Sequence, residues 1–143
     1  MQPNAGSGSQ QKFSFKIPVK GVDPSRVAFV QVLFGNANAS APPFCLVHYD
    51  PSAKALRVYR GPGPLDFTSP ATPGTPSGDL QNTFCKVDST ASAASFSGDE
   101  LDLAITVGFL GPMAGDRVVY WRLQQTSGAD SGWQSVGNWT VTP

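Results

Sequence analysis

Short runs of β-branched and aromatic residues, separated by links rich in glycine and proline, are the feature that most constrains this fold. The runs follow one another at spacings near a dozen residues, and no segment has the apolar periodicity of an amphipathic helix. This pattern predicts an all-β chain folded as an antiparallel sandwich of about eight strands. The runs lie at 12–17, 27–34, 44–49, 55–60, 80–87, 101–107, 117–123 and 131–141.

The order of apolar and polar residues assigns faces to several runs. Residues 12–17 alternate between apolar side chains and Lys or Ser, which is typical of a half-buried strand. Residues 27–34 are apolar at nearly every position, so we expect a central strand that is covered on both faces. Residues 44–49 and 55–60 flank a turn and are predicted to pair as a hairpin, with Tyr59 facing opposite to Leu56 and Val58.

A second hairpin is predicted from Arg117 to Val141, and it holds all the tryptophans of the chain. In its first arm, alternation places Trp121 on a core-facing side with Val119 and Leu123. In the second arm Trp133 and Trp139 share a parity with Val141, unless a bulge intervenes. We expect Trp121 and Trp139 to lie in the core. Trp133 directly follows a Ser-Gly pair, which favours partial exposure.

Three links differ in composition from the runs. Residues 1–10 are rich in Gly, Ser, Asn and Gln and are predicted to be a flexible boundary segment, which leaves residues 11–143 as one domain. Residues 61–79 are rich in Pro and Gly and are expected to be an ordered loop or a meandering edge. Residues 88–94 are small and polar and are expected to link two strands.

The charge balance excludes several kinds of partner. The formal net charge is zero and charged residues make up 14% of the chain. Nucleic acid is therefore not an expected partner, because phosphate binding requires a basic stripe. No run is long and apolar enough for membrane insertion. The first residues lack the basic and apolar regions of an export signal, so we expect any such signal to lie outside this chain.

Cys45 and Cys85 are the only two cysteines. In a β protein that is rich in Ser and Thr and poor in charge, an even count favours one disulfide and an oxidising compartment. The alternative is a pair of unrelated buried thiols. A disulfide would contribute roughly 4 kcal/mol in the chain-entropy model.

No pattern of a catalytic site stands out, and we expect no enzymatic activity and no cofactor. His48 is the only histidine and lies within a predicted strand. The acidic residues lie mostly in turns, and no pair is distinguishable as the acids of a glycosidase.

Asp99, Glu100 and Asp102 form the best candidate for a metal site, because their oxygens could hold Ca²⁺ near a turn. The spacing of a known calcium loop is absent, and solvated turn charges are the commoner reading. We therefore expect no metal.

Aromatic side chains are the stronger candidates for ligand contact. Trp133, Tyr59 and Tyr49 could present rings to a ligand, and a flat set of such rings would suit stacking against sugars. The alternative is that these rings fill the core.

The whole chain resembles a bacterial immunoglobulin-like module of secreted and surface multidomain proteins. The segments that carry the resemblance are PNAGSGSQQKFSF, FVQVLF, FCLVHYD, LQNTFC and SGWQSVGNWTV. The resemblance implies a Cys45–Cys85 disulfide within an immunoglobulin-like sandwich that serves as one unit in a string of domains. The cysteines do not occupy the strands that carry them in antibody domains, so antibody loop roles are not transferred.

The resemblance implies a non-catalytic extracellular or cell-surface module that acts as a spacer, an adhesion domain or a protein-interaction domain. Its expected partners are neighbouring domains of a parent chain and a protein or polysaccharide ligand, and we expect an isolated domain to be a monomer. The alternative function is a carbohydrate-binding module that uses exposed Trp and Tyr.

Overall fold

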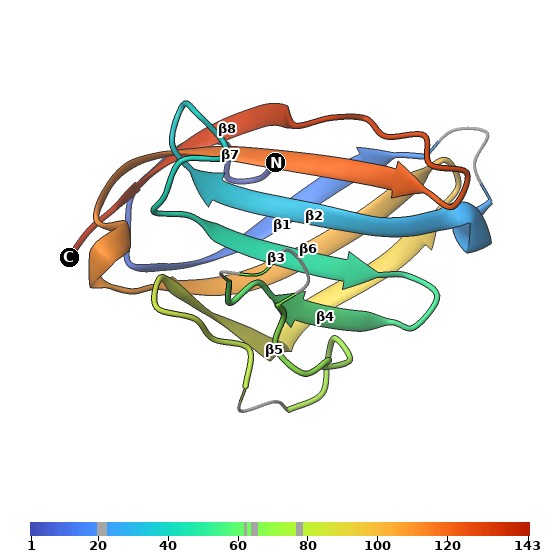
Figure 1. The fold of residues 1–143 in the computed structure, drawn as a ribbon, viewed down its shortest axis with the longest axis horizontal. Coiled ribbons are helices and arrows are strands. Elements are labelled where there is room, and N and C mark those ends of the chain that lie inside the picture. Colours follow the sequence, from blue (N-terminus) through green and yellow to red (C-terminus); the bar gives the residue numbers. More distant parts are fainter. Residues whose placement is uncertain (20–22, 62, 64–65, 77–78) are drawn as a thin grey trace.

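The chain folds as an antiparallel β-sandwich, as the sequence predicted. The computed structural model describes residues 1–19, 23–61, 63, 66–76 and 79–143. In these ranges eight strands form two sheets that lie one behind the other (Figure 1). Two short 3-10 helices, η1 (Pro24–Arg26) and η2 (Gly111–Met113), lie in the connections. Across the same ranges, no helix has the length and apolar character needed to cross a membrane.

The smaller sheet has three strands and the larger one has five. In spatial order the smaller sheet consists of β1 (Gln10–Pro18), β6 (Glu100–Phe109) and β5 (Cys85–Ser97). The larger sheet consists of β4 (Ala55–Val58), β3 (Cys45–Asp50), β2 (Val27–Gly35), β7 (Gly115–Gln125) and β8 (Gln134–Val141). The expected central strand, β2, is the middle strand of the larger sheet, and the hairpins β3–β4 and β7–β8 both form.

Alternate residues of both sheets meet in a core. Phe13 of β1 is fully buried, and its ring lies 5.0 Å from both Phe34 of β2 and Trp139 of β8, measured between ring centroids. Trp139 therefore lies in the core, as predicted. Truncating a fully buried phenylalanine costs about 3–5 kcal/mol, so rings such as Phe13 are central to holding the sheets together.

The disulfide between Cys45 and Cys85 forms, and it joins the two sheets. Cys45 begins β3 of the larger sheet and Cys85 begins β5 of the smaller sheet. Their Cα atoms are 5.8 Å apart across 40 residues of sequence, and both side chains are fully buried. Closing a loop of that length stabilises the folded chain by roughly 4 kcal/mol in the chain-entropy model.

The N-terminal segment, expected to be flexible, is instead hydrogen-bonded along the edge of β8. The Thr140 N–H donates to Gly6 O at 2.9 Å, and the Gly8 N–H donates to Thr140 O at 3.0 Å. The Trp139 indole N–H also donates to Gly8 O at 3.0 Å. A side chain on Gly6 would place its Cβ 2.7 Å from the Trp139 ring, so the glycine that suggested flexibility permits this close contact.

Residues 61–79 join the edges of the two sheets where the structure describes them. Ala71 forms a bridge with Leu56 of β4, and Phe67 forms one with Tyr59, directly after β4. Farther along, the Gly74 N–H donates to Ser89 O in β5 at 2.7 Å. The expected meandering edge is therefore present, and it closes one side of the sandwich.

The polar link expected at 88–94 is part of a strand. β5 runs through it, with a register irregularity between Asp88 and Ala93. Ser92 is buried there; its hydroxyl donates to Asp88 O at 2.7 Å and accepts from the Thr106 N–H at 3.2 Å. Small hydroxyl side chains thus supply hydrogen bonds that the irregular ladder lacks, and composition alone suggested a loop.

Candidate functional site

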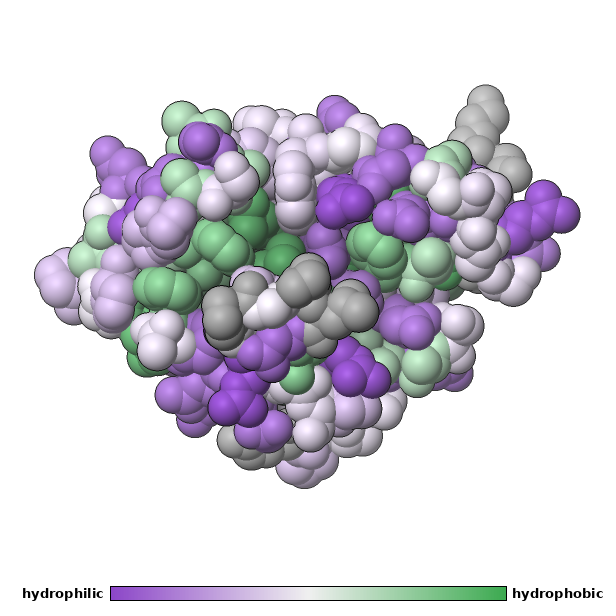
Figure 2. Space-filling model, in the orientation of Figure 1, coloured by the Kyte–Doolittle hydropathy of each residue, from purple (hydrophilic) through white to green (hydrophobic). Residues whose placement is uncertain are grey.

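The outer face of the five-stranded sheet gathers most of the partly exposed rings of the molecule. Because side chains alternate along a strand, the residues between the core positions of β2, β3, β4 and β7 point outward. We call this surface the aromatic face. Its members from the strands and the adjoining segments are Phe29, Gln31, Leu33, Phe44, Leu46, His48, Arg57, Tyr59, Phe67, Tyr120, Arg122, Gln124 and Trp133. Figure 2 looks onto this side of the molecule and shows hydrophobic and hydrophilic residues side by side.

One half of the aromatic face is a continuous series of ring contacts over β3 and β4. The ring centroids of Phe44 and Tyr59 are 5.9 Å apart, and those of Tyr59 and Phe67 are 5.6 Å apart. His48 follows, with its ring 4.9 Å from Phe67 and 4.9 Å from Phe29 of β2. All five side chains are half-buried, so each ring keeps some surface open to solvent.

Arg122 of β7 continues the series to the other half. Its guanidinium carbon lies 5.5 Å from the Phe29 ring centroid and 5.8 Å from that of Trp133. Trp133 in turn meets Tyr120 edge to face, with 6.3 Å between centroids. Cations at such distances are attracted by the ring quadrupole. The series of contacts therefore extends from β4 to the start of β8.

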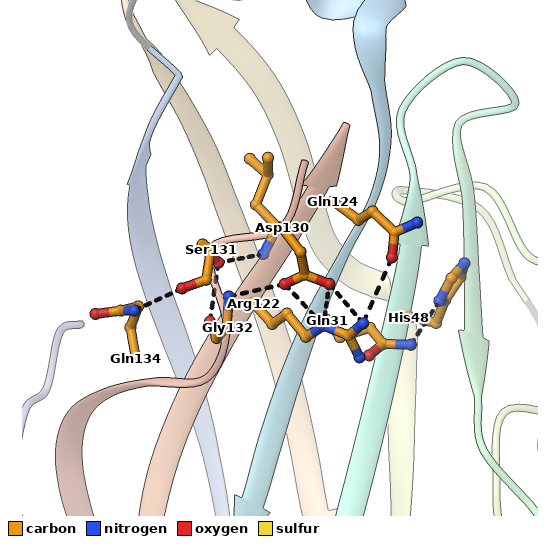
Figure 3. Close-up of polar contacts among 9 residues, drawn as sticks. Gln31, His48, Arg122, Gln124, Asp130, Ser131, Gly132 and Gln134 are labelled. Atoms are coloured by element: carbon orange, nitrogen blue, oxygen red, sulfur yellow. Dashed lines mark hydrogen bonds and ion pairs between the residues drawn. The ribbon is translucent and has the colours of Figure 1, made fainter. Parts of the chain in front are cut away.

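Polar contacts fix the Arg122 side chain. Arg122 donates to both carboxylate oxygens of Asp130, with its shortest contact at 2.6 Å, and to Gln124 Oε1 at 3.4 Å. Asp130 is held by the Gly132 N–H at 2.7 Å. Figure 3 shows Arg122 between Asp130 and Gln124, with Gln31 and His48 nearby. Planar bidentate pairing of this kind fixes the orientation of both partners.

The environment shifts the pKa of two groups on this face. Hydrogen bonding from Arg122 lowers the pKa of Asp130 below its ordinary value, and the Gly132 N–H adds to this effect. Burial lowers the pKa of His48, and Asp50 opposes that shift. The Gln31 amide nitrogen lies 3.2 Å from His48 Nδ1, a contact that suits a neutral ring whose Nδ1 accepts the hydrogen bond. Near neutral pH, the centre of the face therefore carries one balanced ion pair and an uncharged imidazole.

Trp133 and Tyr59, two of the three aromatic residues that the sequence suggested for ligand contact, lie on the aromatic face. The β7–β8 register shifts between Val119 and Tyr120: Val119 pairs with Gly137 and Tyr120 pairs with Ser135. This bulge reverses the parity that Trp133 shared with Trp139. Trp133 therefore lies outside while Trp139 lies in the core.

Tyr49 is the exception among the candidate aromatics, and its placement is corrected. It is 5% exposed and points from β3 into the core, on the side of Cys45 and Val47. Burial also raises the pKa of its phenol. Tyr49 therefore contacts no ligand on the aromatic face. Trp121 was expected in the core; it packs against the core cluster but is only half-buried.

The acidic candidates for calcium lie far from this arrangement, at the β5–β6 turn. Glu100 and Asp102 both approach Lys16 Nζ, at 3.6 and 3.7 Å. Asp99 supplies its backbone carbonyl to the Val19 N–H at 2.7 Å. Within the part of the chain that is described, no three His, Cys, Asp or Glu side chains lie close enough together to hold a metal ion.

Sequence reasoning missed Phe29, Phe67 and Arg122 as members of the face. Phe29 stood in a run that was apolar on both sides, so its outward direction had no marker. Phe67 lies in an irregular segment, where periodicity gives no direction. The sequence did contain a usable signal for β3. Alternation along that strand already placed His48 on the face opposite to the buried side.

In comparisons with known proteins, no protein-family model, no curated protein and no solved structure matches the chain. The aromatic face must therefore be interpreted from its own chemistry.

Proposed function

We propose that this chain is a non-catalytic recognition module of an extracellular protein, of the bacterial immunoglobulin-like kind, and that the aromatic face is its contact surface. One observation carries the proposal: an unbroken series of rings and one guanidinium spans the outside of the larger sheet. Tyr, Trp, Phe and Arg are the residue types enriched where proteins contact partners. Adhesion or partner binding is thus favoured over a role as a passive spacer.

The exposed position of the rings supports this choice. Trp133, Phe67 and Tyr59 lie outside the core cluster that holds the sheets together. Half-exposed rings that are gathered in one patch mark interaction surfaces in soluble proteins. A spacer would be served equally well by polar side chains at these positions.

The state of the groups most often used for catalysis supports a non-catalytic role. His48 lies between two rings and accepts a hydrogen bond from Gln31. Cys45 and Cys85 are joined to each other, which leaves neither as a thiolate nucleophile.

The disulfide supports an extracellular or surface location. A buried cystine between two sheets persists in oxidising compartments and is rare in the reducing cytosol. Together with the resemblance to surface modules, this favours a domain that works outside the cell, next to other domains of a parent chain and as a monomer when isolated.

Retention assays on immobilised surfaces test the proposal. Beads of insoluble polysaccharides and of extracellular-matrix proteins are incubated with the wild-type chain, with a Trp133→Ala, Phe67→Ala double variant, and with a Lys16→Ala, Ser95→Ala double variant. We expect at least one surface to retain the wild type and the Lys16 double variant, and to lose the Trp133 double variant. Retention of none, or equal retention of all three chains, would contradict the proposal.

A further inference from the structure

A row of planar polar side chains crosses the aromatic face at right angles to the strands. Arg57 of β4 pairs in register with His48 of β3, His48 pairs with Gln31 of β2, and Gln31 pairs with Arg122 of β7. Asp130 adds a carboxylate at the β7 end through its ion pair with Arg122. Four strands thus align guanidinium, imidazole and amide groups along one line, in which Gln31 is buried and Arg57, His48 and Arg122 are partly exposed.

The rings lie beside this row rather than apart from it. Phe67 is 4.9 Å from the His48 ring, and Phe29 lies between His48 and Arg122, at 4.9 and 5.5 Å. Trp133 is 5.8 Å from Arg122. Planar polar groups and aromatic rings therefore alternate along the row, close enough together for one sugar ring to contact both kinds of group.

From this alternation we infer that the aromatic face binds a neutral polysaccharide chain that lies across the strands along the Arg57–Arg122 row. The inference rests on the proposed recognition role and names its ligand. A sugar ring has an apolar face of C–H groups and a rim of hydroxyls. Aromatic rings take up the C–H face, and planar amide, guanidinium and carboxylate groups form paired hydrogen bonds with neighbouring hydroxyls.

A protein partner fits the same surface less well. Protein interfaces concentrate apolar residues at the centre and place polar and charged groups at the rim. Here polar groups also lie at the centre, because Gln31 stands between Phe29 and Leu33 on the central strand and has His48 and Arg122 on the two neighbouring strands. Docking an apolar protein surface would bury the Arg122–Asp130 pair, and burying an ion pair is costly unless its hydrogen bonds are replaced.

The charge balance of the row selects a neutral chain over an acidic one. Asp130 offsets the charge of Arg122 through contacts as short as 2.6 Å. His48 accepts the Gln31 hydrogen bond and so contributes no charge. Asp50 lies on β3 two residues beyond His48, the partner of Arg57, and so adds a carboxylate to the same face. With Asp50 and Asp130 counted against Arg57 and Arg122, an anionic polymer would find no surplus of cations here.

Arg122 and Trp133 are the residues that we expect to determine affinity. Arg122 carries a fork of donors whose direction is fixed by Asp130, and a lysine in its place would keep the charge and lose the fork. Trp133 offers the largest ring of the series. The two residues adjoin, so one sugar unit can use both.

The test measures binding of the intact chain to soluble and insoluble neutral polysaccharides, with cellulose, chitin, xylan and starch as the first probes. We expect at least one probe to bind. Trp133→Ala and Arg122→Lys should each weaken that binding by about tenfold or more. Raising NaCl from about 0.05 M to about 0.5 M should change the affinity by less than about twofold, since no counterions are released. Lys16→Ala, on the opposite outer face, is the matched control and should bind as the wild type does.

Folding of each variant is checked by its urea-unfolding midpoint, and Phe67→Ala serves as a second ring variant if Trp133→Ala is destabilised. Binding that is lost in high salt, or that is unchanged by both Trp133→Ala and Arg122→Lys, would overturn the inference. Retention by protein surfaces alone, dependent on the same rings, would also overturn it and would leave the proposed recognition role intact. Retention by no polysaccharide and no protein surface would remove both.

Discussion

The two outer faces of this sandwich are built from the same alternating strands and yet carry opposite chemistry. On the three-stranded sheet, Ser14 pairs with Ala104, which pairs in turn with Ala93, and Lys16 pairs with Asp102, which pairs in turn with Ser95. On the five-stranded sheet the equivalent positions hold the aromatic face. Both sheets contribute their inner residues to one core, so the core alone does not require this difference. It is the feature of the molecule that most directly points to function.

The energetics of the two faces differ in the same sense. Lys16 meets Glu100 and Asp102 across an exposed surface, and exposed ion pairs contribute about 0–1 kcal/mol. Ring pairs add about 0.5–1.5 kcal/mol beyond their buried area. The aromatic face should therefore be the more ordered of the two, even though it too contacts solvent.

Removing the disulfide tests whether both faces depend on one core. Cys45→Ala with Cys85→Ala should lower the free energy of unfolding by roughly 4 kcal/mol, because the 40-residue loop is no longer closed in the unfolded chain. Urea unfolding under non-reducing conditions measures this loss. Hydrogen exchange should show reduced protection in β3 and β5 together. Loss confined to one sheet would mean that the two faces belong to separately stable units.

A matched pair of truncations compares the faces directly. Phe29→Ala removes a half-buried ring that contacts His48 and Arg122, so we expect a loss of about 2 kcal/mol in the free energy of unfolding. Ser14→Ala, on the outer face of β1, should stay within about 0.5 kcal/mol of the wild type. Both are measured by urea unfolding at neutral pH. Equal losses would show that the two outer faces are energetically alike.

The sequence predicted the strands and the disulfide better than it predicted which side chains face outward. Runs of β-branched and aromatic residues placed the strands, and two cysteines in that composition favoured the disulfide, which forms. The prediction that Tyr49 contacts a ligand overlooked the alternation of β3. Tyr49 lies on the same face of the strand as Cys45, and that position already implied burial. The bulge that turns Trp133 outward has no such marker, since a shift of one residue leaves the local sequence pattern unchanged.

Tertiary partners explain the other differences. Residues 1–10 look flexible by composition, but the edge of β8 offers hydrogen-bond partners to Gly6 and Gly8, and the Trp139 ring packs against Gly6. Phe67 joins the aromatic face because its segment is bridged to Tyr59. Both contacts are made between segments that are distant in sequence or irregular in conformation. Propensity and alternation describe neither kind of contact.

A pH titration sharpens the contrast at the centre of the aromatic face. Burial lowers the pKa of His48 below its ordinary 6.5 and Arg57 adds to this, while Asp50 opposes it. The unfolded chain therefore binds a proton more readily, and stability that is present above pH 6.5 is lost as the pH falls toward the folded-state pKa. His48 is the only histidine, and ordinary carboxylates titrate near pH 4. His48→Gln should remove the pH dependence of the unfolding free energy between those values. An unchanged slope in the variant would contradict this role.

The smallest change in the free energy of unfolding is expected on the outer face of the three-stranded sheet. Lys16→Ala removes both ion pairs at the β1–β6 edge, but the Lys16 side chain is 72% exposed, so the free energy of unfolding should change by less than about 0.5 kcal/mol. Salt screens such charges, so the small difference from the wild type should shrink further in high NaCl. Urea unfolding at two salt concentrations measures both. A loss comparable to that of Phe29→Ala would mean that the three-stranded face is also a structured surface, and the assignment of recognition to the aromatic face alone would no longer follow from the difference between them.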